Sequence, residues 1–254
     1  MILLKILPGV LKELATHVPT VFFQLVDWGE IASEVPRLTK KLLQKEGYVD
    51  FLKVQKEFLS PLNIAWSSVA LHEKQNRISR DAGINWLEIY FAQIYSPHGI
   101  FLDLRPQHFD PQQVPLLWHP SGLWSRFAEP FRLGLLKVYD GFYLGDEKLY
   151  YEGLVDVGLM DPEWSDDDKK KLGDLFKEQF GDANTKEVLF TLDKFNQSMT
   201  KTFHFILQKK RQMNVDFMYL GMYLVTLYSA LEKTGEPLPV KDIYLRIRSS
   251  FNHA

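Results

Sequence analysis

Side chains that could bind a metal or move a proton gather in one irregular stretch of the sequence, residues 98–119. His98, Asp103, His108 and His119 lie within it, and the other four of the seven histidines are scattered. Imidazole and carboxylate groups can ligate a divalent metal, but ligands on one helix face must stand three or four residues apart. These histidines lack that spacing, which favours surface or turn positions. Asp103, His108 and His119 remain the candidate metal ligands, and no metal or other cofactor is predicted from them.

Other catalytic patterns are missing or have a simpler explanation. The sequence contains no G-x-S-x-G nucleophile elbow, Walker A loop or dinucleotide fingerprint. The lone Pro-Ser-Gly at 120–122 is typical of a turn. Aspartates 166–168, followed by lysines 169–171, are typical of a solvated helix start, where the helix dipole favours acidic residues. The basic run at 209–211 is isolated, so it indicates a solvated helix face and no nucleic-acid site.

The composition is typical of a folded protein in a reducing compartment. The chain has 254 residues, of which 46% are hydrophobic, and a formal net charge of -2. This apolar share excludes a disordered chain, and the balanced charge gives no basic field for nucleic acid. Because the sequence has no cysteine, disulfides, thiolate zinc sites and thiol nucleophiles are excluded together. We therefore expect a cytoplasmic protein without a nucleic-acid partner.

Two apolar stretches are too short to cross a membrane. Residues 1–10 are interrupted by Lys5, and residues 217–231 lie between Asp216 and Glu232. A transmembrane helix needs about 20 apolar residues, so the second stretch predicts a buried helix. Residues 1–10 also lack the basic start and the small-residue end of a signal peptide. Peripheral contact with a membrane stays open as an alternative.

The elements that must position the candidate residues are mainly helices. Apolar residues recur at helical spacing over 10–18, 31–42, 48–59 and 84–95, and again from residue 126 to the end. This pattern stops between residues 100 and 118, where two short apolar runs predict two strands or a hairpin. No linker or repeat divides the chain. We predict a mainly α fold, a single compact helical domain over residues 1–254 with one small β element near residues 100–118.

Three parts can be distinguished within this domain: a helical N-terminal part (1–83), the segment with the candidate site (84–124) and a helical C-terminal part (125–254). Gly47 predicts the C-terminal end of the helix over 31–42, and residues 186–212 predict one long helix. Ser165 and the acidic residues after it predict a helix start. Aromatic residues at 217, 219, 223 and 228 favour core packing, with an aromatic-lined ligand cavity as the alternative.

The candidate site segment resembles a known catalytic loop. INWLEIYFAQIY (84–95) followed by GIFLDLRPQHFD (99–110) is similar to a helix and loop of the UbiB/AarF (ADCK-type) atypical kinase family, whose loop reads G-F-F-H-A-D-P-H-P-G-N. Asp103 would match the aspartate of that motif and Pro106 its second proline. Leu102 and a one-residue shortening replace the first histidine. Arg105, Gln107 and His108 stand where the family has His, Gly and a metal-binding Asn.

Further stretches resemble the same family in the same order. Residues 114–136 resemble its strand, D-F-G segment and following helix, but Trp118, His119 and Pro120 stand where the D-F-G aspartate would be. Residues 131–160 and 215–238 resemble the helices after the kinase core, and residues 6–21 resemble a segment near the family's K-x-G-Q motif. That motif, the alanine-rich nucleotide loop and the V-A-x-K lysine have no counterpart. Residues 58–74 are the only candidate for a remnant of that lobe.

The resemblance implies a degenerate relative that acts by binding. Kinases hold ATP and Mg²⁺ with a lysine, an asparagine and the D-F-G aspartate, and this chain keeps at most Asp103 of the catalytic set. The implied protein is a non-catalytic, pseudokinase-like binding or assembly protein with a kinase C-lobe-like fold. It would act through a protein partner or an apolar ligand. The alternatives are an unrelated helical adaptor or subunit of a larger complex, and an active atypical kinase or ATPase in which Asp103 is catalytic. An aspartate of this kind is expected at the mouth of a cleft, where its replacement by alanine leaves the fold intact.

Overall fold

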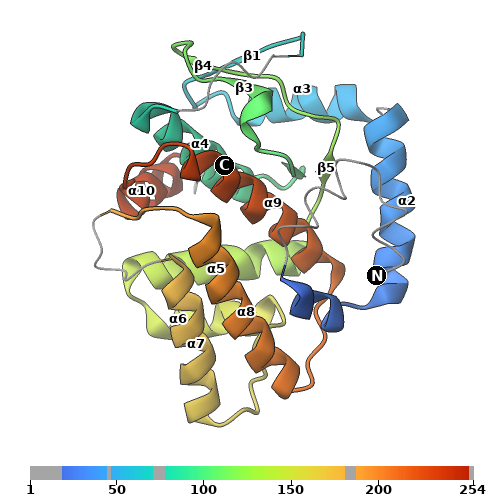
Figure 1. The fold of residues 1–254 in the computed structure, drawn as a ribbon, viewed down its shortest axis with the longest axis vertical. Coiled ribbons are helices and arrows are strands. Elements are labelled where there is room, and N and C mark those ends of the chain that lie inside the picture. Colours follow the sequence, from blue (N-terminus) through green and yellow to red (C-terminus); the bar gives the residue numbers. More distant parts are fainter. Residues whose placement is uncertain (1–18, 45–46, 71–77, 181–186, 252–254) are drawn as a thin grey trace.

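Helices make up most of the chain that the structure describes. This computed structural model describes residues 19–44, 47–70, 78–180 and 187–251 (Figure 1), so the predicted helix at 10–18 lies outside it. The helices are α2 (Trp28–Gln44), α3 (Tyr48–Phe58), α4 (Arg80–Tyr95), α5 (Glu129–Leu144), α6 (Glu147–Asp156), α7 (Asp166–Phe180), α8 (Leu192–Gln208), α9 (Val215–Glu232) and α10 (Val240–Phe251), with short 3-10 helices at Thr20–Gln24 and Pro106–His108. The predicted mainly α fold is confirmed.

Short polar side chains define where several helices begin. The first N–H groups of a helix have no partner within it, and a serine, threonine or aspartate just before the helix can accept from them. Ser79 accepts from Ala82 at the start of α4 at 3.2 Å. Ser165 does the same for Asp168 in α7 at 3.2 Å, as the sequence predicts. Asp146 and Thr191 cap α6 and α8 in the same way.

Two predicted helix ends differ from the structure. Gly47 was expected to end the helix over 31–42, but it occupies the N-cap position of α3 with a φ of 65°, a left-handed conformation that suits glycine. The long helix predicted from residue 186 starts only at Leu192. Before it, Val188 pairs with Leu238 through two backbone hydrogen bonds of 2.8 and 2.9 Å. This pairing fixes the backbone in an extended form, and Thr191 then caps the helix.

The β structure consists of two small sheets. The first contains β1 (Ile64–Trp66), β4 (Leu116–Trp118) and β3 (Phe109–Asp110) in the order β1-β4-β3; the second pairs β2 (Ile100–Phe101) with β5 (Trp124–Ser125). Both predicted strands therefore exist, but they do not pair with each other. β4 pairs with β3 in an antiparallel hairpin and with β1 in parallel. The small β element thus extends beyond residues 100–118 to β1 and β5.

A single apolar core connects all of these elements. Its buried side chains run from Val21 to Phe251. Figure 1 shows the sheet of β1, β3 and β4 at one end of the molecule beside α4, and α6, α7 and α8 toward the other end. Helix α9 passes through the centre, and most of its side chains are buried, as predicted for residues 217–231. None of the helices in the described ranges is long and apolar enough to cross a membrane.

The aromatic residues of α9 belong to this core. Phe217, Tyr219, Tyr223 and Tyr228 are all at most 6% exposed. Tyr223 stacks on Tyr90 of α4 with the ring centroids 4.8 Å apart. Predicted core packing is therefore confirmed. Rings buried to this degree leave little of their surface for contact with another molecule.

Candidate functional site

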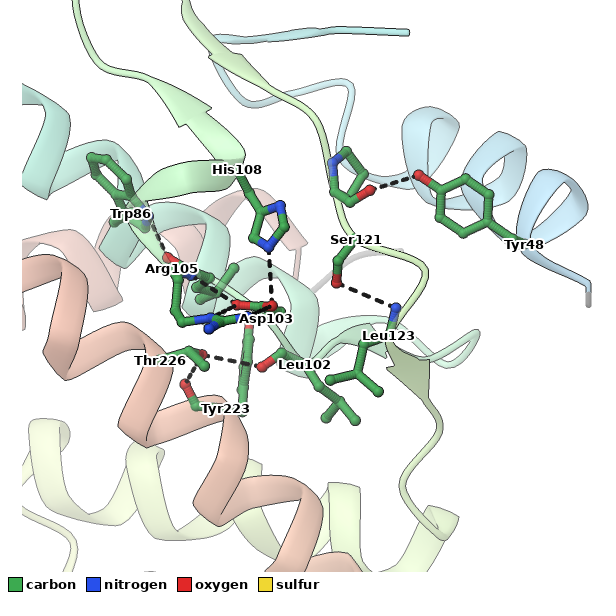
Figure 2. A network of polar contacts seen from close by, with 12 residues as sticks. Tyr48, Trp86, Leu102, Asp103, Arg105, His108, Ser121, Leu123, Tyr223 and Thr226 are labelled. Carbon is green, nitrogen blue, oxygen red and sulfur yellow. Dashed lines mark hydrogen bonds and ion pairs between the residues drawn. The ribbon is translucent and has the colours of Figure 1, made fainter. Parts of the chain in front are cut away.

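The candidate site centres on a buried carboxylate that is shared by two basic side chains (Figure 2). Oδ1 of Asp103 accepts from the backbone N–H of Arg105 at 3.2 Å and from its Nε at 2.8 Å. Oδ2 accepts from Nη2 of Arg105 at 2.8 Å and lies 3.0 Å from Nε2 of His108. Both oxygens are therefore engaged, in a bidentate arrangement that favours a strong pair.

Asp103 and Arg105 are buried, and His108 is partly buried. Asp103 is 1% exposed, Arg105 is 5% exposed, and the His108 side chain is 17% exposed. Burial alone raises the pKa of the Asp103 carboxyl, because the charged form loses its hydration. Hydrogen bonds and positive charge from Arg105 and His108 act in the other direction and are stronger, so the pKa of Asp103 lies well below its ordinary value. The carboxyl is held as an anion.

The backbone on either side of Asp103 is fixed by groups from three elements. The carbonyl of Leu102 accepts from Oγ1 of Thr226 in α9 at 3.1 Å, and its N–H donates to the carbonyl of Leu123 at 3.0 Å. The carbonyl of Leu104 accepts from the indole of Trp86 in α4 at 3.0 Å. Leu102 and Leu104 are themselves fully buried. The loop is thus part of the core, and Figure 2 shows these contacts surrounding the carboxylate.

Asp103 does not lie at the mouth of a cleft, and this prediction was wrong. The alternation Leu102–Asp103–Leu104 buries apolar side chains next to the carboxylate, which forces it to find partners inside the protein. Of the other candidate residues, only His108 contacts it. His98 lies against the ring of Phe58, with centroids 6.4 Å apart. Within the described residues, no group of three or more histidine, aspartate or glutamate side chains is arranged to hold a metal.

Residues 118–120, which the sequence analysis compared with a D-F-G segment, are also packed against the rest of the protein. Trp118 is fully buried and stacks on Phe109 and Trp66 at 5.4 and 4.9 Å. Nδ1 of His119 lies 3.0 Å from the carbonyl oxygen of Ser67, and the carbonyl of Pro120 accepts from the hydroxyl of Tyr48 at 2.8 Å. These contacts tie the segment to β1 and α3. They do not bring it into contact with the Asp103 carboxylate.

Sequence reasoning missed the role of Arg105. The resemblance placed it opposite a histidine of the family loop, and nothing in that comparison pointed to an ion pair. A usable signal was the Asp-x-Arg spacing, because a guanidinium two residues away can bridge back to both oxygens of a carboxylate. The spacing alone does not reveal burial. Burial depends on α4 and α9, which are distant in the sequence.

One cavity in the described core has an aromatic lining and is small. A cavity of about 20 Å³ lies between α4, α5 and α9, lined by Tyr90, Tyr139, Tyr143 and Tyr228 among others. A cavity of this size holds roughly one water molecule. An aromatic lining therefore exists, as the alternative interpretation expected, but it encloses no room for a quinone or a lipid.

Comparison with known proteins gave no match to a family model and none to a curated protein.

The charged state of Asp103 leads to a testable pH dependence. Because its folded pKa is below its unfolded value of about 3.9, the group stabilises the fold above that value, and this contribution is lost as the pH falls below about 4. We expect the stability difference between the unaltered protein and Asp103→Asn to shrink as the pH falls from 5 toward 3. Urea unfolding at several pH values measures it. A difference that is the same at pH 7 and pH 3 would contradict the assignment.

Proposed function

We propose that this protein is a non-catalytic binding or assembly protein, resembling a degenerate UbiB/AarF atypical kinase, that acts through a protein partner. The observation that carries the proposal is the engagement of the Asp103 carboxylate by Arg105 and His108. A catalytic aspartate of a kinase loop must accept a proton from a substrate hydroxyl or stay near Mg²⁺. Asp103 can do neither without giving up a buried ion pair.

The β structure supports a pseudokinase-like fold over an unrelated helical adaptor. An adaptor built as an uninterrupted helical bundle would have no strands between residues 100 and 118. Here the β3–β4 hairpin follows the Asp103 loop directly, and β2 precedes it. This order of loop and hairpin before the C-terminal helices is what the family resemblance implies. The lack of cysteine agrees with the cytoplasmic location that we propose with it.

Exposed aliphatic side chains of the described residues are candidates for contact with a protein partner. Leu43, Val49 and Val69 are 70 to 73% exposed, and we call them the apolar face. Val49 follows Tyr48, which bonds Pro120, and Val69 lies two residues after Ser67, which bonds His119. The chain next to Val49 and the chain next to Val69 are therefore bonded to the adjacent residues Pro120 and His119. We propose that these exposed aliphatic side chains contribute to the docking site of the partner.

Association through the apolar face can be measured in extracts. We expect the unaltered protein in its native extract to elute in an assembly larger than the 29.7 kDa chain. Val49→Asp combined with Val69→Asp should elute as the free chain, because charges exclude an apolar partner. Leu144→Asp, at an exposed position on α5, is the matched control and should behave like the unaltered protein. Elution of all three proteins at the same volume would contradict the apolar face as the docking site.

A non-catalytic protein of the proposed kind should not bind ATP. We expect isothermal titration with ATP and MgCl₂ to give no saturable binding below millimolar concentrations. Three lost charge-assisted contacts of about 1.5–3 kcal/mol each move a micromolar affinity beyond the millimolar range. The contacts in question are those of the lysine, the asparagine and the D-F-G aspartate that the sequence lacks.

If ATP does bind, the binding contradicts the proposal only when it depends on the Asp103 loop. Asp103→Asn keeps the shape of the side chain and removes its charge. Asp140→Asn removes a carboxylate that pairs with Arg248 at 2.5 Å, outside the Asp103 loop. Micromolar binding of ATP that survives in Asp140→Asn and disappears in Asp103→Asn would overturn the proposal and restore the active kinase or ATPase.

A further inference from the structure

Helix α2 is attached to the rest of the protein by few buried side chains. Of its side chains that the structure describes, only Ile31 and Leu38 are buried, at 7% and 1% exposure. Helix α9 has a similar length, and most of its side chains are buried. Figure 1 shows α2 at the edge of the molecule. Because helices in proteins owe most of their stability to the packing of an apolar face, α2 is held less firmly than the central helices.

The sequence of α2 also makes it a weak helix on its own. Pro36 lies inside the helix. A proline there has no N–H to donate to the carbonyl four residues earlier, which belongs to Ala32, and its ring crowds that carbonyl. The helical form of α2 therefore depends on its contacts with the rest of the protein. A segment of this kind can open by itself while the core stays folded.

Polar contacts to α9 and β5 hold α2 in place. Nη2 of Arg37 donates to the hydroxyl of Tyr219 in α9 at 2.7 Å, and that hydroxyl donates to Oε2 of Glu34. Nε of Arg37 donates to the same carboxylate oxygen at 2.7 Å. Nζ of Lys41 lies 3.5 Å from the centre of the Trp124 ring in β5. The Arg37 side chain is 46% exposed, so water competes for its bonds and weakens them.

A carboxylate of α9 opposes this docking. Oδ1 of Asp216 accepts from the N–H of Ala128 at the start of α5, at 3.1 Å. On the α2 side, Oε2 of Glu30 accepts from the N–H of Val215, the neighbour of Asp216, at 3.3 Å. Burial raises the pKa of Asp216, the Ala128 N–H lowers it, and the negative charges of Glu30 and Glu34 raise it further. Like charges therefore face each other between α2 and α9, and opening of α2 relieves their repulsion.

We propose that α2 is a latch that opens reversibly from α9 and β5 while the rest of the fold stays closed, and that the Asp216 carboxylate favours the open form. Opening exposes Leu38, and it uncovers the ring of Trp124 on the side where Lys41 lies. The other side of that ring stacks on Phe51, with the centroids 4.2 Å apart. The latch thus controls access to an aromatic surface that the closed form covers.

A single engineered thiol can report the opening, because the full chain has no cysteine. Leu38→Cys places the thiol beneath α2, and Leu87→Cys places it at a position of α4 that is also 1% exposed. With excess DTNB, we expect Leu38→Cys to react about tenfold faster than Leu87→Cys, since only the latch opens locally. Adding Asp216→Asn removes the charge and should slow the reaction of Leu38→Cys about threefold at the same pH. Adding Asp242→Asn, at an exposed position of α10, is the matched control and should leave it unchanged.

Hydrogen exchange of the unaltered protein gives a second measurement that needs no variant. We expect the amides of α2 to exchange faster than those of α4 and α9. Circular dichroism establishes that each cysteine variant is folded before labelling. The latch is overturned if the amides of α2 exchange as slowly as those of α9, or if the two thiols react at the same rate. The part assigned to the carboxylate is overturned if Leu38→Cys reacts equally fast with and without Asp216→Asn.

Discussion

Replacing Asp103 with alanine is expected to lower the free energy of unfolding by about 3–5 kcal/mol, the cost of removing one partner of a buried ion pair. The substitution leaves the Arg105 guanidinium, 5% exposed, without its counter-ion. It also removes the acceptor of the His108 N–H. Urea unfolding of the two proteins at pH 7 measures the difference. This outcome reverses the sequence-based expectation that the fold tolerates the change, because that expectation assumed an aspartate at a cleft mouth.

Two further variants separate the ion pair from other effects. Replacing both partners, as Asp103→Leu with Arg105→Met, should recover much of the lost stability, since no uncompensated charge is then buried. Glu178→Ala is the control on an exposed pair: Glu178 and Lys201 are 53% and 59% exposed. An exposed pair is worth about 0–1 kcal/mol, so its loss should be small. A cost below about 1 kcal/mol for Asp103→Ala would show that the pair is not structural.

Much of the helical fold could be predicted because it depends on local pattern. Ser165 marks the start of α7 by the hydrogen bond that its hydroxyl accepts, as predicted, whereas the helix expected from residue 84 already begins at Arg80 after the cap Ser79. The apolar run at 217–231 is too short for a bilayer and lies in the core as α9. Gly47 shows the limit of such signals. A glycine with positive φ fits a helix end as well as the position before the next helix, and only the neighbouring chain decides between them.

The strand pairing could not be predicted because it depends on distant segments. β4 is three residues long and pairs with β1, about fifty residues earlier, as well as with β3. Ile64–Trp66 has no alternating pattern that separates it from a loop. What stabilises it there is the stacking of Trp66 on Trp118. An aromatic contact between residues so far apart leaves no mark on local periodicity.

The sequence indicated Asp103 and His108 as members of the candidate site, but it indicated neither Arg105 nor the chemistry of the site. Asp103, His108 and His119 lie close in the sequence, and the structure brings His108 into contact with Asp103 and opposite His119. Their setting is different from the one expected. The carboxylate is buried by α4 and α9 and paired with Arg105, so the loop supports the fold. Tertiary contacts therefore decided what these residue types can do.

The contact between α5 and α6 depends on glycines that the sequence alone marks as poor helix formers. Gly141 of α5 and Gly153 of α6 lie in the helices and not at their ends. A Cβ at residue 141 would stand 2.5 Å from the Cα of Tyr150, and one at residue 153 would stand 2.5 Å from the backbone nitrogen of Val138. The two helices thus approach each other backbone to backbone.

Adding one methyl group at this contact is expected to be strongly destabilising. Gly141→Ala should lower the free energy of unfolding by about 3 kcal/mol, the upper end of the usual cost of overpacking, because the atoms it meets are backbone of Tyr150 and cannot rotate away. Gly221→Ala is the matched control: it is also a helical glycine, but an added Cβ has nothing within 4 Å. There the better helix propensity of alanine should raise stability by up to about 1 kcal/mol. Thermal and urea unfolding of the two variants should therefore differ in sign, and equal effects would show that α5 and α6 do not pack this closely.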